Sequence, residues 1–406
     1  MKNIVKQNLL IIIVFSLVGC STAKVTGQST GRTAVFALNL KAIEKNKAAI
    51  KNGDPSIMPA YKQLIKDAEK SLEFAPVSVM EKTNTPPSGD KHDYMSLAPY
   101  FWPDPSKPNG LPYIRKDGQT NPEVKDYKDK EYMPKLCGHV ETLALVYFLS
   151  DDNKYAEHAV KLLRGWFLDE ATRMNPNLKY GQAIKGINEG RGAGLIDSRH
   201  FVKLIDAIGL LQNSKSWKAA DQKGMQQWFA AFLNWMQTSK IGIDELNAKN
   251  NHGAWYDAQR LAMALFIDST DLAKRIISNA AGRLDHQADD KGFFPAEIQR
   301  TISLHYTAFV MEPFFIIANM AEQTGFDLWN YTTPSGKSLR KSFTVLKPYF
   351  SNEKKWDGEQ IKDYEFADGY MLLMEGAKQY GCSDCAAAVQ RLAADKGPGL
   401  RINLFY

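Results

Sequence analysis

Apolar residues recur at helical spacing along most of this chain. In ten segments they occupy positions i, i+3, i+4 and i+7, the pattern of a helix that buries one face. These segments are residues 58–72, 136–149, 155–167, 201–211, 225–235, 258–266, 272–284, 307–320, 339–349 and 364–380. The apolar and polar alternation that indicates strands is rare. The pattern predicts an all-α protein.

Loops that contain Gly, Pro and Asn separate these segments. Helices of about 12 to 20 residues joined by such loops predict helical hairpins stacked in a ring, an incomplete α/α toroid. The 406 residues exceed the usual size of one core, so either two domains or one large helical barrel is expected. We predict a single toroid over residues 33–406, with a groove lined by loops at the inner helix ends.

Residues 83–127 lack the helical pattern. They are rich in Pro, Gly, Asp and Lys, and they include Tyr100, Trp102, Tyr113 and Arg115. Long irregular segments in compact domains are usually functional or disordered, and the aromatic content argues against disorder. We expect this segment to form a lid or a wall over a cleft.

Residues 174–199 form a second irregular segment. Side chains that can contact sugar hydroxyls or carboxylates occur in it at Tyr180, Gln182, Asn188, Arg191 and Arg199. Its glycines at positions 190, 192 and 194 are expected to serve tight backbone turns, because glycine adopts such conformations without a steric penalty.

Composition adds a weak indication about the ligand. Hydrophobic residues make up 44% and charged residues 24%, which is ordinary for a globular protein, while 11% aromatic residues favour carbohydrate contact. The net charge is +6, and loss of Lys2 and Lys6 would leave +6 − 2 = +4. A mild basic excess suits a polyanionic substrate. The basic residues are scattered, so nucleic acid is not expected as a partner.

The N-terminus predicts export. Lys2 and Lys6 precede an apolar run over residues 9–18, which is too short for a membrane span and typical of a signal peptide. The ending Leu-Val-Gly-Cys at 17–20 resembles a bacterial lipobox. We expect residues 1–20 to be a lipoprotein signal, with cleavage before a lipid-bearing Cys20, and residues 21–32 to be a flexible tether. No acidic cluster follows Cys20, which favours a lipoprotein that faces the periplasm from the outer membrane over one on the cell surface.

Three further cysteines remain. Cys382 and Cys385 form a Cys-x-x-Cys pair, which fits a redox motif, half a metal site or a local disulfide. We expect a local disulfide or two inert thiols. A redox motif would normally follow a strand in a βαβ unit, whereas the residues around this pair predict helix-turn-helix. Cys137 is expected to be buried. The 7 His residues form no compact ligand cluster in the sequence, so we expect no metal and no cofactor.

Two polar runs contain the groups that β-elimination of a uronate polymer requires. Residues 250–255 read Asn-Asn-His-Gly-Ala-Trp, and residues 300–306 read Arg-Thr-Ile-Ser-Leu-His-Tyr. The reaction needs donors that offset charge on the carboxyl group, a base for the proton next to it, and an acid for the departing oxygen. If Tyr306 is the base, its pKa must be lowered, and Arg300 and His252 are the candidates for that effect.

Asn-Asn-His-x-x-Trp with a distant Arg and Tyr resembles the alginate lyase superfamily, in particular polysaccharide lyase family five. The separation of His252 and Tyr306, 306 − 252 = 54 positions, is similar to that family. The resemblance implies that Asn251 binds the carboxylate with Arg300, while His252 and Tyr306 act as base and acid. In family five the Arg lies seven positions before the Tyr, which here is Gln299, whereas Arg300 lies six before.

Further segments resemble polysaccharide lyase family thirty-eight more than family five. They are residues 96–105, 110–118, 174–178 and 190–199. This resemblance implies alginate or glucuronan as substrate. The candidate substrate-binding residues are Tyr100, Trp102, Tyr180, Gln182, Arg191, Arg199, Asn250, Trp255 and His305. We expect the protein to act as a monomer on an anionic polysaccharide.

Two other classes of protein fit parts of the sequence. A glycoside hydrolase on an α/α barrel would use paired carboxylates, for which Glu189, Asp197, Asp257 and Glu297 are candidates. A glycan-binding lipoprotein without catalysis would use the aromatic and basic groups for capture alone. The complete set of Asn, His and Tyr favours the lyase.

Overall fold

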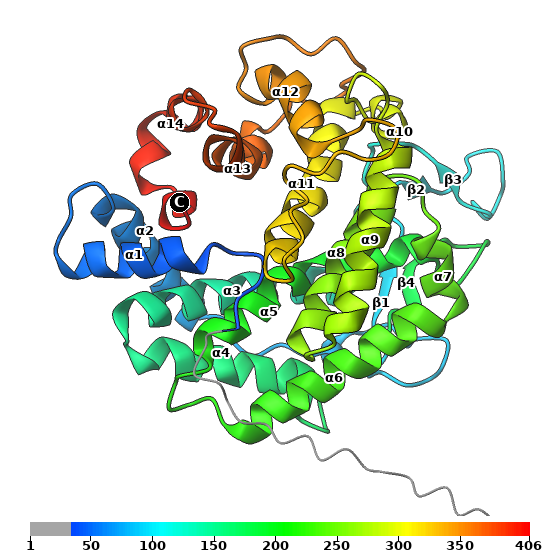
Figure 1. The fold of residues 1–406 in the computed structure, drawn as a ribbon. Helices are drawn as coiled ribbons and strands as arrows, with labels where there is room; N and C mark the ends of the chain where they lie inside the picture. Colours follow the sequence, from blue (N-terminus) through cyan, green and yellow to red (C-terminus); the bar gives the residue numbers. More distant parts are fainter. Residues whose placement is uncertain (1–33) are drawn as a thin grey trace, which may run out of the picture. The chain divides into compact units, whose positions relative to one another are not determined.

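The structure of the chain is a computed structural model that describes residues 34–406, and this part is built almost entirely from helices (Figure 1). The helices are α1 Leu40–Lys51, α2 Met58–Leu72, α3 Lys128–Ser150, α4 Asn153–Leu163, α5 Phe201–Leu211, α6 Ala219–Thr238, α7 Lys240–Leu246, α8 Asn251–Phe266, α9 Thr270–Gln287, α10 Pro295–Ile298, α11 Ser303–Glu322, α12 Leu339–Phe350, α13 Tyr370–Tyr380 and α14 Cys385–Ala393. The strands are β1 Met95–Leu97, β2 Phe101–Trp102, β3 Ile114–Arg115 and β4 Tyr180–Ala183. The prediction of an all-α protein is confirmed.

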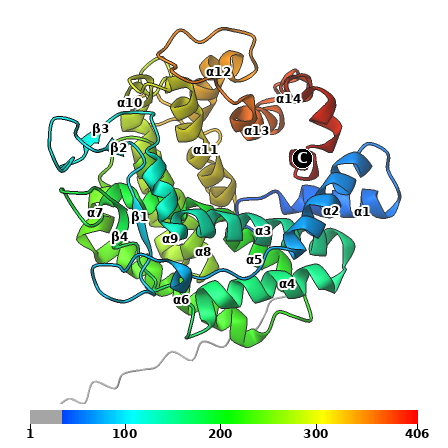
Figure 2. The ribbon, with the colours of Figure 1, turned by 180° about the vertical axis from the view of Figure 1, so that it is seen from behind.

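The helices follow one another around a ring (Figures 1 and 2). Helix α3 packs on α4 and α5, and α8 packs on α9 and α11. The two ends of the described chain meet beside α1 and α2, where the Asn46 amide donates hydrogen bonds to the backbone carbonyls of Asn403 and Leu404 at 3.4 and 3.2 Å. Arg401 donates to Thr142 on α3 at 2.8 Å. These contacts join the last turns to the first helices, as expected for a toroid of helical hairpins.

Helices α5 and α8 are buried along almost their whole length, and aromatic rings pack against α5. Phe201 on α5 lies against Phe167, Trp228 and Phe232, with ring centroids 5.6 to 5.8 Å apart in edge-to-face geometry. Each fully buried ring of this kind stabilises the fold by about 1.5 to 3 kcal/mol. These rings hold α5 against α6.

Several predicted helix boundaries agree with the structure and others do not. Helices α2 and α5 have the predicted bounds. The helix predicted over 364–380 begins only at Tyr370, because a 3₁₀ turn over Phe366–Gly369 precedes it. Helix α1 was not predicted, since it buries only Ile43 and Asn46 and so carries almost no apolar stripe.

The irregular segment 83–127 is ordered and forms a wall of the toroid. Its strand β1 pairs in parallel with β4 of the second irregular segment, with Met95 opposite Tyr180. Strands β2 and β3 pair as an antiparallel hairpin, with Phe101 opposite Arg115 and Trp102 opposite Ile114. The two irregular segments are thus joined to each other.

The glycines of the second irregular segment allow close backbone packing. A Cβ atom at Gly190 would lie 2.0 Å from the Lys179 carbonyl oxygen, and one at Gly194 would lie 2.3 Å from the Gly181 oxygen. Neither residue has a positive φ. The predicted turn is present, because a 3₁₀ helix runs over Gly192–His200 and the Gly194 N–H donates to the Arg191 carbonyl at 2.9 Å. Glycine is required at positions 190 and 194 because of the near contact with the chain around β4.

The cysteine predictions agree with the structure. Cys382 and Cys385 form a disulfide in the turn between α13 and α14, and Cys137 is buried in α3. The predicted signal, the lipidation at Cys20 and the tether lie outside the described residues. Across residues 34–406, no helix is both long and apolar enough to cross a bilayer.

Candidate active site

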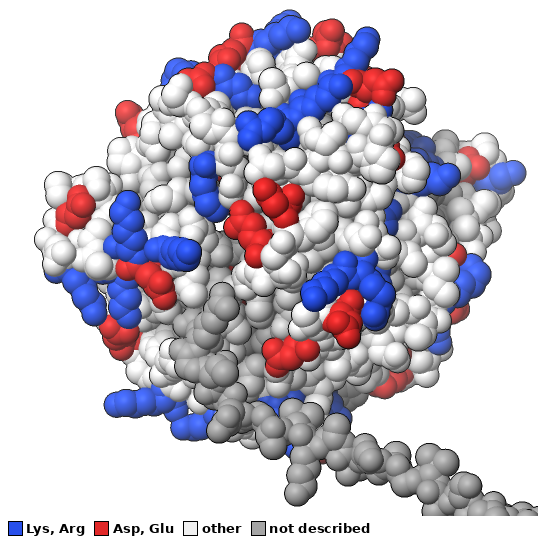
Figure 3. All heavy atoms as spheres, in the orientation of Figure 1, with Lys and Arg blue, Asp and Glu red and all other residues white. Residues whose placement is uncertain are grey.

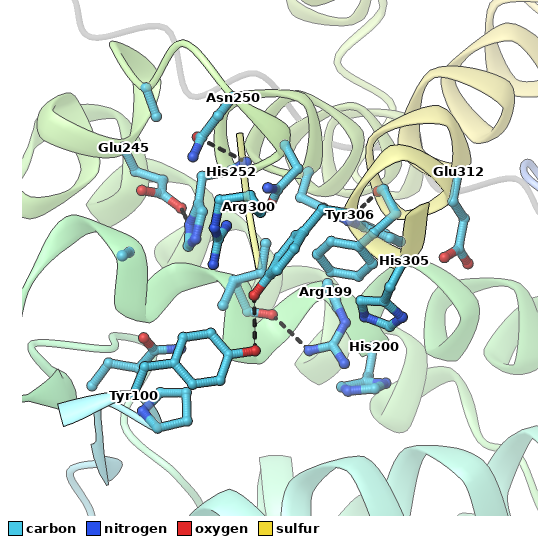
Figure 4. A pocket seen from close by; sticks show the side chains of 18 of the residues that line it. Tyr100, Arg199, His200, Glu245, Asn250, His252, Arg300, His305, Tyr306 and Glu312 are labelled. Atoms are coloured by element: carbon cyan, nitrogen blue, oxygen red, sulfur yellow. Dashed lines mark hydrogen bonds and ion pairs between the residues drawn. The ribbon is translucent and has the colours of Figure 1, made fainter. Parts of the chain in front are cut away.

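A cavity of about 710 Å³ lies where the two irregular segments meet the beginnings of α8 and α11. The sequence-predicted residues that line it are Tyr100, Gln182, Arg191, Arg199, Asn250, Asn251, His252, Trp255, Arg300, His305 and Tyr306. They come from positions far apart in the chain, and Figure 4 shows several of them pointing toward one another. The fold therefore brings the two polar runs into one site.

Two predicted substrate-binding residues, Trp102 and Tyr180, do not line this cavity. Successive residues of a strand point to opposite faces. Phe101 faces the cavity, so Trp102 faces away, where its indole nitrogen donates to the Gln119 carbonyl at 2.9 Å. Tyr180 is only 3% exposed and belongs to the core around β4. Both side chains therefore lie outside this cavity, and their role in substrate binding stays a prediction.

The Asn-Asn-His run begins helix α8, whereas the sequence placed it just before the helix. Asn250 is the N-cap, and its side-chain oxygen accepts a hydrogen bond from the His252 backbone N–H at 3.3 Å. Asn is a preferred N-cap because its oxygen satisfies a free donor of the first turn. The cap fixes the direction in which the next two side chains leave the helix.

Gly253 leaves room for an arginine that fastens the α7–α8 connection. A Cβ at this position would lie 2.1 Å from Nη1 of Arg283. Arg283 donates to the carbonyls of Ala248 and Leu246 at 2.7 and 3.0 Å and is paired with Asp257 at 2.7 Å. The glycine of the motif is thus explained by packing.

Asn251 is held by a buried carboxylate. Its backbone N–H donates to Oε1 of Glu297 at 2.6 Å, and its side-chain nitrogen donates to Oε2 at 2.8 Å. Burial raises the pKa of Glu297, and the hydrogen bonds from Asn251 oppose this shift. The side-chain oxygen of Asn251 has no hydrogen-bond partner within residues 34–406. One hydrogen of the amide nitrogen is engaged, and the second remains for a ligand.

His252 is paired with Glu245 on α7, with Nδ1 2.7 Å from Oε1 (Figure 4). A carboxylate only accepts hydrogen bonds, so Nδ1 carries the hydrogen and Nε2 of the neutral ring is an acceptor. A Cβ at Gly192 would lie 3.0 Å from the Glu245 backbone nitrogen, so this glycine permits the approach of α7. Nothing in the sequence pattern indicated Glu245.

Tyr306 lies in the first turn of α11, and its hydroxyl donates to the Tyr100 hydroxyl at 2.8 Å. The Arg300 guanidinium lies over its ring, 3.6 Å from the centroid. Burial raises the pKa of Tyr306 well above its ordinary value, the nearby Tyr100 adds to this, and the Arg300 cation opposes it. Arg300 thus lowers the pKa of Tyr306, as expected, but the effect of burial is larger. The phenol therefore stays protonated.

Arg300 is held by Asp117, another residue that the sequence pattern did not indicate. Nε and Nη2 of Arg300 donate to the carboxylate at 3.0 and 2.7 Å. Burial by itself would raise the pKa of Asp117, but the hydrogen bonds from Arg300 and Thr301 hold it well below its ordinary value. The pair is therefore ionised at neutral pH.

Cations outnumber carboxylates among the described residues that line the cavity. The cations are Arg115, Lys130, Arg191, Arg199, Lys203 and Arg300, and the carboxylates are Glu245, Glu312 and Asp368. On the face drawn in Figure 3, by contrast, Lys and Arg are interspersed with Asp and Glu. A cation surplus inside a cavity attracts an anionic ligand.

A family model described as alginate lyase matches residues 78–356, which is more than half of the 406 residues. The chain belongs to the alginate lyase family. A solved structure described as an alginate lyase from Bacteroides ovatus is similar to this family member at 40% identity and a TM-score of 0.87, over 92% of this chain and 98% of that one.

More distant structures show the same fold in other proteins of this kind. Alginate lyase A1-III from Sphingomonas species A1 is 16% identical with a TM-score of 0.58, over 92% of this chain and 96% of that one. A histidine-to-alanine variant of A1-III complexed with tetrasaccharide is 16% identical with a TM-score of 0.60, over 92% of this chain and 96% of that one. These structures and the present one share the same ring of helices, so the predicted toroid is confirmed.

Curated alginate lyases match a shorter part. The protein of Pseudomonas putida strain GB-1 is 28% identical over 167 residues, and that of strain W619 is 25% identical over 170 residues. Each match covers 40% of this chain and 45% of the relative. The chain thus matches less than half of the length of these relatives.

The carboxylates that the sequence offered for a hydrolase do not line the cavity of this alginate lyase family member. They are Glu189, Asp197, Asp257 and Glu297. Asp197 is 2% exposed and accepts hydrogen bonds from Tyr94 and Ser96 at 3.0 and 2.7 Å. Asp257 and Glu297 are likewise buried, at 0% and 1% exposed, whereas Glu189 is exposed.

His200, on the cavity wall, is expected to make the alginate lyase family member sensitive to acid. Burial lowers its pKa to about 3, and the nearby Arg199 and Lys203 add to this. An unfolded histidine titrates near 6.5. Below about pH 6.5 the unfolded chain binds a proton that the folded chain refuses, so stability falls as pH drops from about 6.5 toward 3.

Urea unfolding at several pH values measures this effect. In His200→Gln the free energy of unfolding should fall less between about pH 6.5 and pH 3 than in the wild type. His286 is exposed, so His286→Gln should show the wild-type dependence of this free energy on pH. Equal slopes in wild type and His200→Gln would contradict the assignment.

Proposed function

We propose that this protein is a polysaccharide lyase that cleaves alginate by β-elimination and leaves an unsaturated uronate at the new end. One observation carries the proposal: a histidine with a free ring nitrogen, a protonated tyrosine and an arginine lie together in a cavity with a surplus of cations. Figure 4 shows Arg300 between His252 and Tyr306. These are the groups that the reaction needs.

Arg300 and Asn251 are suited to bind the carboxylate of the reacting sugar. When the adjacent C–H bond breaks, negative charge grows on this carboxylate, and donors that are already in place stabilise it. Arg300 has no hydrogen-bond partner for Nη1 within residues 34–406, and Asn251 retains one amide hydrogen. Both donors are fixed by carboxylates, Asp117 and Glu297, so little rearrangement is required.

His252 is suited to remove the proton and Tyr306 to supply one. Nε2 of His252 takes the proton on the carbon beside the carboxylate, and Glu245 stabilises the resulting imidazolium. The C–H electrons form the new double bond, the glycosidic C–O bond breaks, and the departing oxygen takes the proton of the Tyr306 hydroxyl. The raised pKa of Tyr306 keeps this proton in place until the bond breaks. Proton exchange with solvent restores both residues.

Glucuronan is a second candidate substrate for the same residues, because it presents the same carboxylate and C–H bond. The relatives named above are all described as alginate lyases, which is why we place alginate first. The epimers differ in the face that offers the proton, so the substrate ranking also reports on the base.

The proposal is tested by incubating the protein without residues 1–20 with each polymer and following the ultraviolet absorbance of the products. The polymers are alginate, its mannuronate-rich and guluronate-rich blocks, and glucuronan, and no metal is added. A rise in absorbance is expected, because only elimination creates the conjugated double bond. Shortening of the polymer without such a rise would indicate hydrolysis. Binding without shortening would indicate a glycan-binding protein.

A further inference from the structure

Asp117 receives hydrogen bonds from several donors just after β3. Besides Arg300, the Thr301 backbone N–H and hydroxyl each donate to Oδ2 at 3.2 Å. Arg115, across the turn, donates to Oδ1 at 2.6 Å. The carboxylate is only 18% exposed. A side chain with this many donors is fixed in one position.

The contact with Arg300 is the stronger of its two ion pairs. The Arg115 side chain is 55% exposed, so water screens that pair. The Arg300 side chain is 14% exposed and its Nε and Nη2 both reach the carboxylate, a bidentate geometry that fixes orientation as well as distance. The main effect of Asp117 therefore falls on Arg300.

This contact determines how the guanidinium faces the cavity. One edge of the planar group is occupied by Asp117, and its face lies 3.6 Å from the centroid of the Tyr306 ring. The Nη1 side is left for a ligand. A free arginine samples many rotamers, so without Asp117 the guanidinium would not stay in this plane.

The position of Asp117 is itself fixed from the far side of the site. Lys362 donates to the Gly118 carbonyl at 2.6 Å, and the Ile361 N–H donates to the Thr301 carbonyl at 2.8 Å. Gly118 has a φ of +70°, and a Cβ there would lie 2.6 Å from the Thr301 hydroxyl oxygen. The irregular segment and the start of α11 are thus joined around this carboxylate.

We propose that Asp117 is a positioning residue for the reaction, which holds the Arg300 guanidinium flat on Tyr306 with Nη1 directed to the uronate carboxylate. The proposal rests on the proposed function, because it names how the charge-stabilising donor of that reaction is set in place. Asp117 does not line the cavity, so it acts on the substrate through Arg300.

Asp117→Asn is the test, and Asp104→Asn is the matched control. Asp104 lies in the same irregular segment, and its side chain accepts hydrogen bonds only from Ser106 within the described residues. Both changes remove one negative charge. Asp117→Asn is expected to lower kcat/KM about 10- to 100-fold, the effect of a misplaced catalytic group, while Asp104→Asn stays within about 2-fold.

A double-mutant cycle with Arg300→Ala separates positioning from general damage. If Asp117 acts through Arg300, Asp117→Asn causes almost no further loss in the Arg300→Ala background. The split between kcat and KM gives a second readout. Asp117→Asn leaves the Arg300 charge in the cavity but not its placement, so the loss falls mainly on kcat, whereas Asp104→Asn changes neither kcat nor KM.

Equal rates for the two single variants, or additive losses in the cycle, would overturn the proposal. Should Asp117→Asn unfold, Asp117→Glu retains the charge, displaces the guanidinium and is subject to the same cycle. If the wild type forms no unsaturated product, the proposed function fails by itself. The cycle is then measured by calorimetry on the affinity for a mannuronate oligosaccharide, where additivity again overturns the role of Asp117.

Discussion

Tyr306→Phe is expected to abolish formation of the unsaturated product and to leave the protein folded. The change removes the proton donor for the departing oxygen, and loss of a general acid lowers rates about a hundred- to ten-thousand-fold. The ring remains and keeps its contacts with Arg300 and Phe309. The fold loses one partly buried hydrogen bond, to Tyr100, which contributes about 1 kcal/mol.

Tyr100→Phe is the matched control for this variant, because it removes the same hydrogen bond from the other side and leaves the Tyr306 hydroxyl in place. Product absorbance and thermal unfolding are measured on both proteins. A strong loss in Tyr306→Phe and a small one in Tyr100→Phe is the expected pattern. Activity retained by Tyr306→Phe would rule out its role as the acid.

Asp257→Ala is expected to produce the largest loss of stability. Asp257 is fully buried on α8 and pairs with Arg283 at 2.7 Å and with Arg260 at 3.6 Å. Removing one partner of a buried ion pair leaves an uncompensated charge and costs about 3 to 5 kcal/mol. Arg283 also binds the carbonyls of Leu246 and Ala248, so the loss extends to the connection that places Glu245 beside His252.

Urea unfolding of Asp257→Ala and Asp244→Ala measures this contrast. Asp244 on α7 pairs with Lys240 at the surface, where both side chains are more than half exposed, so its removal should change the free energy of unfolding little. Similar unfolding midpoints for the two variants would show that the buried pair does not stabilise the α7–α8 connection.

Much of the fold follows from local pattern. Helices with a wide apolar face, such as α2 and α5, were located correctly, because burial of that face is the main source of their stability. The short helices α7 and α10 were missed. Each has seven residues or fewer, too few to establish a period, and tertiary contacts stabilise them.

The candidate site divides in a similar way. The motif spacing identified Asn251, His252, Arg300 and Tyr306, and the structure places all of them on one cavity. Trp102 lies outside the cavity, which the sequence did not indicate because it does not tell which face of a two-residue strand looks inward.

The sequence by itself determined the helical class of the chain and the groups available for chemistry, since both depend on residue type and short spacing. Only the tertiary structure decided which carboxylates hold those groups. Asp117 lies 183 positions from Arg300, and Glu297 lies 46 positions from Asn251. Even Glu245, seven positions from His252, reaches it only because the chain turns between α7 and α8. A hydrogen bond requires contact in space, and separation along the chain does not specify such contact.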